Sequence, residues 1–246
     1  SDCMRTSRIY IDLALQAGSE ISLPADASHH LAVVLRVKAG QPVILFNNAG
    51  IEAQATIARV DKKKVDVSVG AVQSIERESP LKIHLAIGIS RGERMDFVLQ
   101  KSTELGVHAI TPLFCERTEV KLSEERLQKK MEQWQKIIIG ACEQSGRTRL
   151  PMLHSPSMLD ACLAADSSEQ RFVLHHRSDS TLAQREEKPA SVLLLVGPEG
   201  GLSDDEIQRA KQSSCAALTL GPRVLRTETA PLAAISVLQY RWGDFC

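Results

Sequence analysis

The sequence predicts an α/β protein in two parts: an N-terminal part made mostly of strands and a C-terminal part with a parallel sheet. Three observations predict this. Apolar and polar residues alternate with period two between residues 8 and about 75. Beyond residue 80, apolar runs alternate with helical patterns. The charged stretch at 76–80 separates the two patterns, so we expect one domain at residues 1–75 and a second at 76–246.

In the N-terminal part, the apolar run at 43–46 predicts a strand, and the turn residues at 47–50 end it. Two further strands are predicted where apolar residues alternate with polar ones, at 53–57 and 65–69. Strands that are half-buried in this way are typical of a small antiparallel sheet or barrel. One short helix is expected at 26–36, with Leu31, Val34 and Leu35 on one face.

The C-terminal part predicts a parallel sheet because its strands alternate with helices. The expected strands are 83–89, 109–114, 172–175, 192–196 and 218–220. The expected helices are 93–105, 123–144, one that begins after Ser203, and 229–240. Ser123 can cap the second of these, and Ser203 with Glu206 forms a capping box for the third.

Composition excludes several classes of protein. Thirty basic and thirty acidic residues give a net charge of zero, so a polyanionic partner requires a local basic patch. Aromatic residues make up 4%, too few for a protein that stacks several bases on exposed rings. The six cysteines show no metal-binding spacing, and several lie in apolar patterns, so free thiols in a reducing cytoplasm are expected, several of them buried. We find no apolar run long enough to span a bilayer and no signal-peptide pattern.

Two glycine-proline loops follow predicted buried strands and are the best candidates for a ligand site. The first has the sequence GPEGG at 197–201, and the second begins with GPRVLRTET at 221–229. Ligands of open α/β sheets bind at the carboxyl ends of the strands, where such loops lie. The first loop lacks the phosphate-binding glycine motifs, and Glu199 would repel a phosphate. It suits a hydroxyl, amine or cationic group, although a tight turn without a ligand explains it equally well.

Charged residues gather in three further places. Arg223, Arg226 and Glu228 lie in the second loop, where they can hold a substrate or simply form a solvated helix start. Arg91 and Arg94 follow another strand and can bind a phosphate or a base carbonyl. The segment at 143–149 suits a nucleic acid or a subunit contact. The histidines form no Ser/His/Asp arrangement.

Together these segments resemble the ribosomal RNA small subunit methyltransferase E family. The matching stretches are SRGERMDF at 90–97, QKSTELG at 100–106, WQKI at 134–137, ACEQ at 141–144, GPEGGL at 197–202, LGPRVLRTET at 220–229, RIY at 8–10 and HLxxVLR at 30–36. The resemblance implies an N-terminal PUA-like β-barrel and a C-terminal SPOUT α/β domain with a trefoil knot. It also implies a cytoplasmic homodimer, without a metal, that uses S-adenosylmethionine to methylate N3 of one uridine near the decoding centre of 16S ribosomal RNA.

The resemblance also implies roles for individual residues. The cofactor-binding set is Leu174, His175, Gly197, Glu199, Gly200, Gly201, Leu220, Leu225, Arg226 and Thr229. Arg94 and Arg226 are the candidates for stabilising a uracil anion, and Glu228 for accepting its proton. The RNA-binding candidates are Arg8, Arg36, Lys38, Arg91 and Arg147. Two alternatives stay open: 2′-O-methylation of ribose by the same fold, and a non-catalytic RNA-binding assembly factor.

Overall fold

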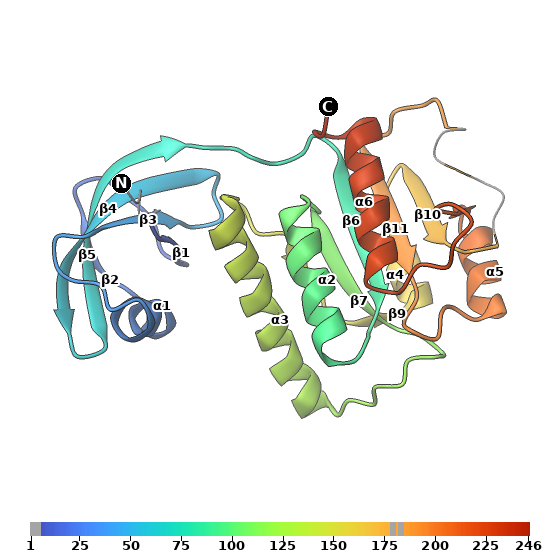
Figure 1. The fold of residues 1–246 in the computed structure, drawn as a ribbon, viewed down its shortest axis with the longest axis horizontal. Coiled ribbons are helices and arrows are strands. Elements are labelled where there is room, and N and C mark those ends of the chain that lie inside the picture. Colours follow the sequence, from blue (N-terminus) through green and yellow to red (C-terminus); the bar gives the residue numbers. More distant parts are fainter. Residues whose placement is uncertain (1–5, 178–180, 182–184) are drawn as a thin grey trace. The chain divides into compact units, whose positions relative to one another are not determined.

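The structure, a computed structural model, describes residues 6–177, 181 and 185–246 of the chain. The chain divides into two compact units (Figure 1). The first comprises the described residues up to Glu78 together with Cys142–Leu150, and the second comprises Ser79–Ala141 and Pro151–Cys246. No local pattern in the sequence indicates that Cys142–Leu150 packs with the N-terminal residues.

The first unit contains a five-stranded sheet in the order β1-β3-β4-β5-β2. Its strands are β1 (Arg8–Tyr10), β2 (Glu20–Ser22), β3 (Pro42–Phe46), β4 (Ile51–Asp61) and β5 (Lys64–Ser74). β1 pairs with β3 in parallel, and the other pairs are antiparallel. The alternating residues of β4 and β5 point into one core, as predicted. Within the described residues no pairing joins β1 to β2, so a closed barrel is not confirmed.

The predicted helix at 26–36 is confirmed as a helical segment that ends at Val34, but the predicted apolar face is wrong. An α-helix, α1 (Ala25–His29), is followed by a π-helical turn, η1 (His30–Val34), and Arg36 has a left-handed backbone with φ of 52°. Leu31 is fully buried, whereas Val34 and Leu35 are exposed. The π-helical turn changes the angle between successive side chains, so the apolar residues of this segment do not lie on one buried face as an α-helix would place them.

The second unit contains a seven-stranded sheet in which every pairing is parallel. Its order is β12-β10-β11-β6-β7-β8, and β9 pairs with β7. The strands are β6 (Lys82–Gly88), β7 (Ala109–Phe114), β8 (Met152–Leu153), β9 (Ser157–Met158), β10 (Gln170–Leu174), β11 (Ser191–Val196) and β12 (Cys215–Leu218). The predicted parallel sheet is confirmed, although β8 and β9 were not expected.

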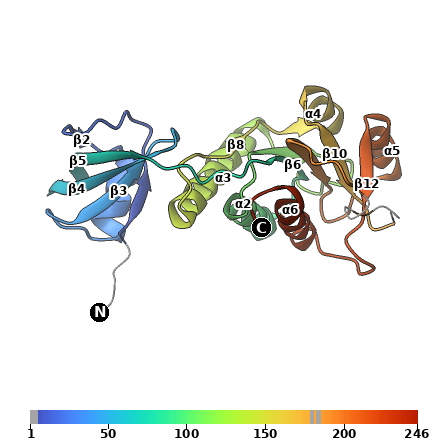
Figure 2. The same ribbon diagram turned by 90° about the horizontal axis from the view of Figure 1, so that it is seen from above.

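Helices cover both faces of this sheet (Figures 1 and 2). α2 (Gly92–Glu104), α3 (Glu124–Ser145) and α6 (Thr229–Trp242) pack on one face through residues such as Leu99, Trp134 and Leu238. α4 (Leu159–Ala165) and α5 (Asp204–Gln212) pack on the other. The predicted capping box of α5 is confirmed, since Ser203 Oγ accepts a hydrogen bond from the backbone N–H of Glu206 at 3.1 Å and Glu206 Oε1 accepts one from that of Ser203 at 3.0 Å.

Four cysteines are buried, as their apolar surroundings predicted: Cys115, Cys142, Cys162 and Cys215. Burial raises the pKa of the first two thiols to about 12 and that of the other two to about 11. Cys246 is exposed, and Cys3 lies outside the described residues. No helix in the described ranges is long and apolar enough to cross a membrane.

Candidate active site

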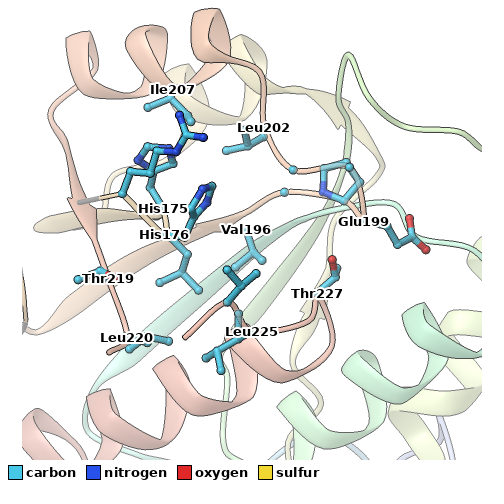
Figure 3. A pocket seen from close by; sticks show the side chains of 18 of the residues that line it. His175, His176, Val196, Glu199, Leu202, Ile207, Thr219, Leu220, Leu225 and Thr227 are labelled. Atoms are coloured by element: carbon cyan, nitrogen blue, oxygen red, sulfur yellow. The ribbon is translucent and has the colours of Figure 1, made fainter. Parts of the chain in front are cut away.

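A cavity of about 500 Å³ lies at the carboxyl ends of β10, β11 and β12 (Figure 3). These three strands are neighbours and run in parallel, so the loops that leave them meet at one edge of the sheet. Both glycine-proline loops contribute to its lining. Eight of the predicted cofactor-binding residues line it: Leu174, His175, Gly197, Glu199, Gly200, Gly201, Leu220 and Leu225. Two others, Arg226 and Thr229, do not, whereas Thr227 and Ala230 do.

The first loop needs its glycines because its backbone folds tightly on itself. A Cβ atom on Gly197 would lie 2.7 Å from the backbone nitrogen of Leu202 and 2.9 Å from the carbonyl carbon of Gly201. Gly201 has φ of 77°, which side chains other than glycine rarely adopt, and its N–H donates to the carbonyl of Pro198 at 2.8 Å. Arg117, which the sequence analysis missed, donates to the carbonyl of Gly200 at 3.1 Å and also lines the cavity.

Apolar side chains form much of the lining: Leu174, Val196, Leu202, Ile207, Leu218, Leu220, Val224 and Leu225. In Figure 3, His175 and Ile207 lie at one end of the cavity and Glu199 at the other. Burial, followed by the charges of His176, Lys211 and Arg177, lowers the pKa of His175 and so favours its neutral imidazole. The carboxylates of Glu199 and Asp204 are the acidic groups of the lining. The guanidinium groups of Arg117, Arg177 and Arg223 are its basic groups, so the lining suits a ligand that has apolar faces and also carries charged groups.

Glu199 connects the first loop to the start of α2. Its Oε1 accepts a hydrogen bond from the backbone N–H of Arg91 at 3.1 Å and forms an ion pair with Arg94 Nη1 at 3.3 Å. The Glu199 side chain is 19% exposed and that of Arg94 48%, so this pair is partly screened by solvent. A predicted catalytic arginine is thus held against the predicted cofactor loop, although more than a hundred residues separate them in the sequence.

The other predicted catalytic residues lie at the start of α6. The carbonyl of Arg226 accepts hydrogen bonds from the backbone N–H groups of Thr229 and Ala230, both at 3.0 Å, and its side chain is exposed. Glu228 is half-buried. The Arg226 side chain is therefore accessible to a ligand, while its carbonyl accepts hydrogen bonds from the first two residues of α6.

The five predicted RNA-binding residues fall into two groups. Arg36, Lys38 and Arg91 are exposed. Arg8 and Arg147 are buried: the Arg8 side chain is 9% exposed and pairs with Glu52 at 2.9 Å, and the Arg147 side chain is 5% exposed and pairs with Glu78. Arg8 also donates to three backbone carbonyls. Arg8 and Arg147 each pair with a carboxylate of the first unit. The RNA contacts proposed below therefore do not include them.

In the parts of the chain that the structure describes, no group of three or more His, Cys, Asp or Glu side chains is placed to hold a metal ion. Five polar residues that line the cavity lie outside the two glycine-proline loops and were not among the predicted site residues: Arg117, His176, Arg177, Asp204 and Thr219. His176 and Arg177 follow β10 directly, and this position after a strand is the one signal that points to them.

Comparison with known proteins defines the class of protein. A family model for an RNA methyltransferase domain matches residues 77–239, and one for an RNA methyltransferase PUA domain matches residues 23–70. The parallel sheet, the cavity at its carboxyl edge and these matches make the chain an RNA methyltransferase with a PUA domain.

Similar proteins narrow this class. Ribosomal RNA small subunit methyltransferase E from Buchnera aphidicola subsp. Schizaphis graminum is 38% identical, over 98% of both chains, and that from Bacillus subtilis is 35% identical, over 95% of this chain and 96% of the relative. The chain belongs to the ribosomal RNA small subunit methyltransferase E family.

Two solved structures support the same family assignment. The Neisseria gonorrhoeae member, solved with S-adenosylmethionine bound, has a TM-score of 0.91 and 38% identity over 98% of this chain and 100% of that one. A Legionella pneumophila methyltransferase, also solved with S-adenosylmethionine, has a TM-score of 0.96 and 48% identity over the same shares.

Proposed function

We propose that this ribosomal RNA methyltransferase uses S-adenosylmethionine to methylate N3 of one uridine in 16S ribosomal RNA, near the decoding centre of the small subunit. The observation that carries the proposal is the cavity at the carboxyl ends of β10, β11 and β12, which both family-specific loops line. The choice of N3 and of the decoding centre rests on the resemblance of the motifs at 90–106 and 220–229 to those of the family.

The residues of the cavity fit the proposed cofactor. Its volume of about 500 Å³ lies within the range of about 300–1,000 Å³ that is typical of small-molecule sites. Leucine and valine side chains can enclose an adenine ring, and the glycines let a ligand approach the backbone closely. A phosphate cradle is missing from both loops, which suits a ligand that carries a positive charge instead. When bound, S-adenosylmethionine supplies a methyl group on a positively charged sulfur.

The chain's own residues must make the uracil nitrogen nucleophilic. N3 of uracil carries a proton and becomes a nucleophile when that proton leaves, with the negative charge shared by the two ring carbonyls. In our proposal Arg94 and Arg226 stabilise this charge and Glu228 accepts the proton. Glu199 would position Arg94, because the 3.3 Å ion pair holds that guanidinium beside the cofactor loop.

Exposed cations support the proposed binding of RNA. Arg36 and Lys38 in the first unit and Arg91 in the second are available for phosphate contacts. Phosphate contacts position a protein on RNA, and reaching N3 also requires the target base to be unstacked. Our proposal includes a homodimer that works in the cytoplasm, where small ribosomal subunits are assembled.

We also propose the two fold features that the family resemblance implies, a PUA-like β-barrel in the first unit and a trefoil knot in the second. The PUA domain match supports a PUA-like barrel. A trefoil knot would bring the loops after β10, β11 and β12 to one ligand, and their common cavity supports that arrangement.

A methylation assay on small-subunit particles, followed by mass spectrometry of the nucleosides, tests the proposal. We expect 3-methyluridine. Formation of 2′-O-methylated nucleosides alone would replace our proposal with ribose methylation. Calorimetric titration with S-adenosylmethionine is the second measurement. A protein that neither binds the cofactor nor methylates RNA would instead be a non-catalytic RNA-binding assembly factor.

A further inference from the structure

A second cavity, of about 250 Å³, lies where β6 leads into α2. Its lining comes from three segments: the start of α2, the stretch at 119–122, and α3. The residues that matter below are Ser90, Arg91, Met95, Lys130 and Trp134. All of them belong to the second unit. The SRGERMDF motif begins in this cavity, and the function proposed above leaves its first residue, Ser90, without a role.

This cavity adjoins the cofactor cavity. Arg91 lines the second cavity and Glu199 lines the first. The backbone N–H of Arg91 donates to Glu199 Oε1 at 3.1 Å, so the two linings are in direct contact. A ligand in the second cavity would therefore lie beside whatever occupies the first.

The charged and polar side chains of the second cavity are Ser90, Arg91, Glu119 and Lys130. Arg91 Nη2 pairs with Glu119 Oε2 at 3.5 Å, which leaves Ser90 and Lys130 as the donors that a ligand can engage. Ser90 is 5% exposed, and its hydroxyl oxygen has no hydrogen-bond partner among the described residues. A buried hydroxyl left in this state destabilises the empty cavity, so a ligand that pairs with it gains affinity. Lys130 is half-buried on α3, and no ion pair with it is found in the described part of the chain. A hydroxyl and an ammonium group together suit a ligand with carbonyl oxygens.

The remaining lining is apolar and of limited size. Met95 and Trp134 line the cavity but are only 1% and 2% exposed, so they belong to the core and close the apolar wall of the cavity. A volume of about 250 Å³ lies just below the range of about 300–1,000 Å³ for whole small-molecule ligands. The cavity therefore suits a single base better than a complete nucleotide cofactor.

We propose that the second cavity receives the unstacked target uracil, with Ser90 donating to one ring carbonyl and Lys130 facing the other. This inference rests on the proposed function, because it assigns the place of that reaction's substrate. Uracil matches the site since it presents two carbonyls, on either side of N3. When N3 loses its proton, the negative charge moves onto those carbonyls, where the Lys130 ammonium stabilises it. Lys130 is then a specificity-determining residue that also favours the reactive anion.

Fluorescence gives a direct test that does not depend on turnover. The chain has two tryptophans, so Trp242→Phe leaves Trp134 of the cavity as the only one. With the cofactor cavity saturated by S-adenosylhomocysteine, uridine 5′-monophosphate should change the Trp134 emission saturably. Inorganic phosphate should not. No saturable change with the nucleotide, or an equal change with phosphate alone, would overturn the proposal.

Substitutions then test the two donors. Ser90→Ala should weaken the binding of uridine 5′-monophosphate about three- to tenfold, as expected for one neutral hydrogen bond, and Lys130→Met about tenfold or more. Ser157→Ala and Lys129→Met are matched controls. Ser157 has a buried hydroxyl that likewise lacks a partner among the described residues but lies outside the cavity, and Lys129 is an exposed neighbour on α3. Equal effects in the controls would refute the assignment.

The methylation assay separates this inference from the proposed function. Ser90→Ala and Lys130→Met should slow methylation of small-subunit particles while leaving the dissociation constant for S-adenosylmethionine unchanged. A weaker cofactor affinity in Ser90→Ala would instead assign the cavity to the cofactor and overturn the proposal. If the wild-type protein binds the cofactor and methylates RNA but both variants keep the wild-type rate, the base site is wrong and the proposed function stands.

Discussion

Adding one methyl group at Gly197 should distort the cofactor loop. In Gly197→Ala the new Cβ would lie 2.7 Å from the backbone nitrogen of Leu202 and 2.9 Å from the carbonyl carbon of Gly201. Both neighbours are backbone atoms, so no side-chain rotation can relieve the overlap. The loop at 197–202 must move, and it lines the cavity at the ends of β10, β11 and β12.

The size of the effect follows from the cost of overpacking, which is about 1–3 kcal/mol for a buried methyl group with no room. With an m-value of about 2 kcal/mol per molar urea, the unfolding midpoint should fall by about 0.5–1.5 M. Both tryptophans lie in the second unit, so their fluorescence reports the unfolding of the unit that contains Gly197. Cofactor affinity, measured by calorimetry, should fall tenfold or more, which corresponds to about 1.4 kcal/mol.

Gly140→Ala is the matched control. Gly140 is exposed within α3, and a Cβ atom there would meet nothing within 4 Å. The same chemical change should stabilise the helix by about 0.5–1 kcal/mol and raise the midpoint by about 0.25–0.5 M, with cofactor affinity unchanged. A Gly197→Ala protein with the wild-type midpoint and the wild-type affinity would refute the close-approach argument.

Three further predictions concern single side chains. Arg226→Ala should lower the methylation rate about 10²–10³-fold by removing a positive charge near the reacting base, whereas Arg126→Ala on α3 should not; an unchanged rate would exclude Arg226 from the reaction. A thiol reagent applied to the native protein should label Cys246 and none of the four buried thiols, because burial keeps those protonated, and peptide mass spectrometry would detect any exception. Burial raises the pKa of Asp166, but hydrogen bonds from neighbouring side chains outweigh it and the pKa lies below its ordinary value. Its ionised form therefore stabilises the fold above the unfolded pKa of about 3.9. Asp166→Asn should lower the urea midpoint at pH 6, and this effect should disappear below about pH 4. A gap between the midpoints of the variant and the wild type that grew on acidification would contradict the assignment.

The sequence predicted those parts of the fold that local patterns determine. Alternation in β4 and β5 identified two strands of the first unit, because one face of each is buried. The Ser203 capping box identified the start of α5, because its two hydrogen bonds join residues three apart. Strands separated by helices identified the parallel sheet of the second unit.

Features that depend on distant contacts were not predictable in this way. The sequence marks Arg8 and Arg147 as charged and hence as surface candidates, yet each is buried against a carboxylate 44 or 69 residues away. The strand order β12-β10-β11-β6 likewise follows from packing between distant segments, and it decides which loops share a cavity. Motif spacing alone could not show that Thr227 and Ala230 line that cavity while Arg226 does not.

Glu199 links the two proposed binding sites physically. One of its carboxylate oxygens accepts the backbone N–H of Arg91, which lines the base cavity, and pairs with Arg94, a predicted catalytic residue. Glu199 itself lies in the loop that lines the cofactor cavity. A ligand that orders this loop therefore also fixes the start of α2, and with it one side of the proposed uracil site. The ion pair between Glu199 and Arg94 is partly exposed, so it adds little to the stability of the fold. Its main effect is to hold the cofactor loop and the start of α2 in a fixed arrangement.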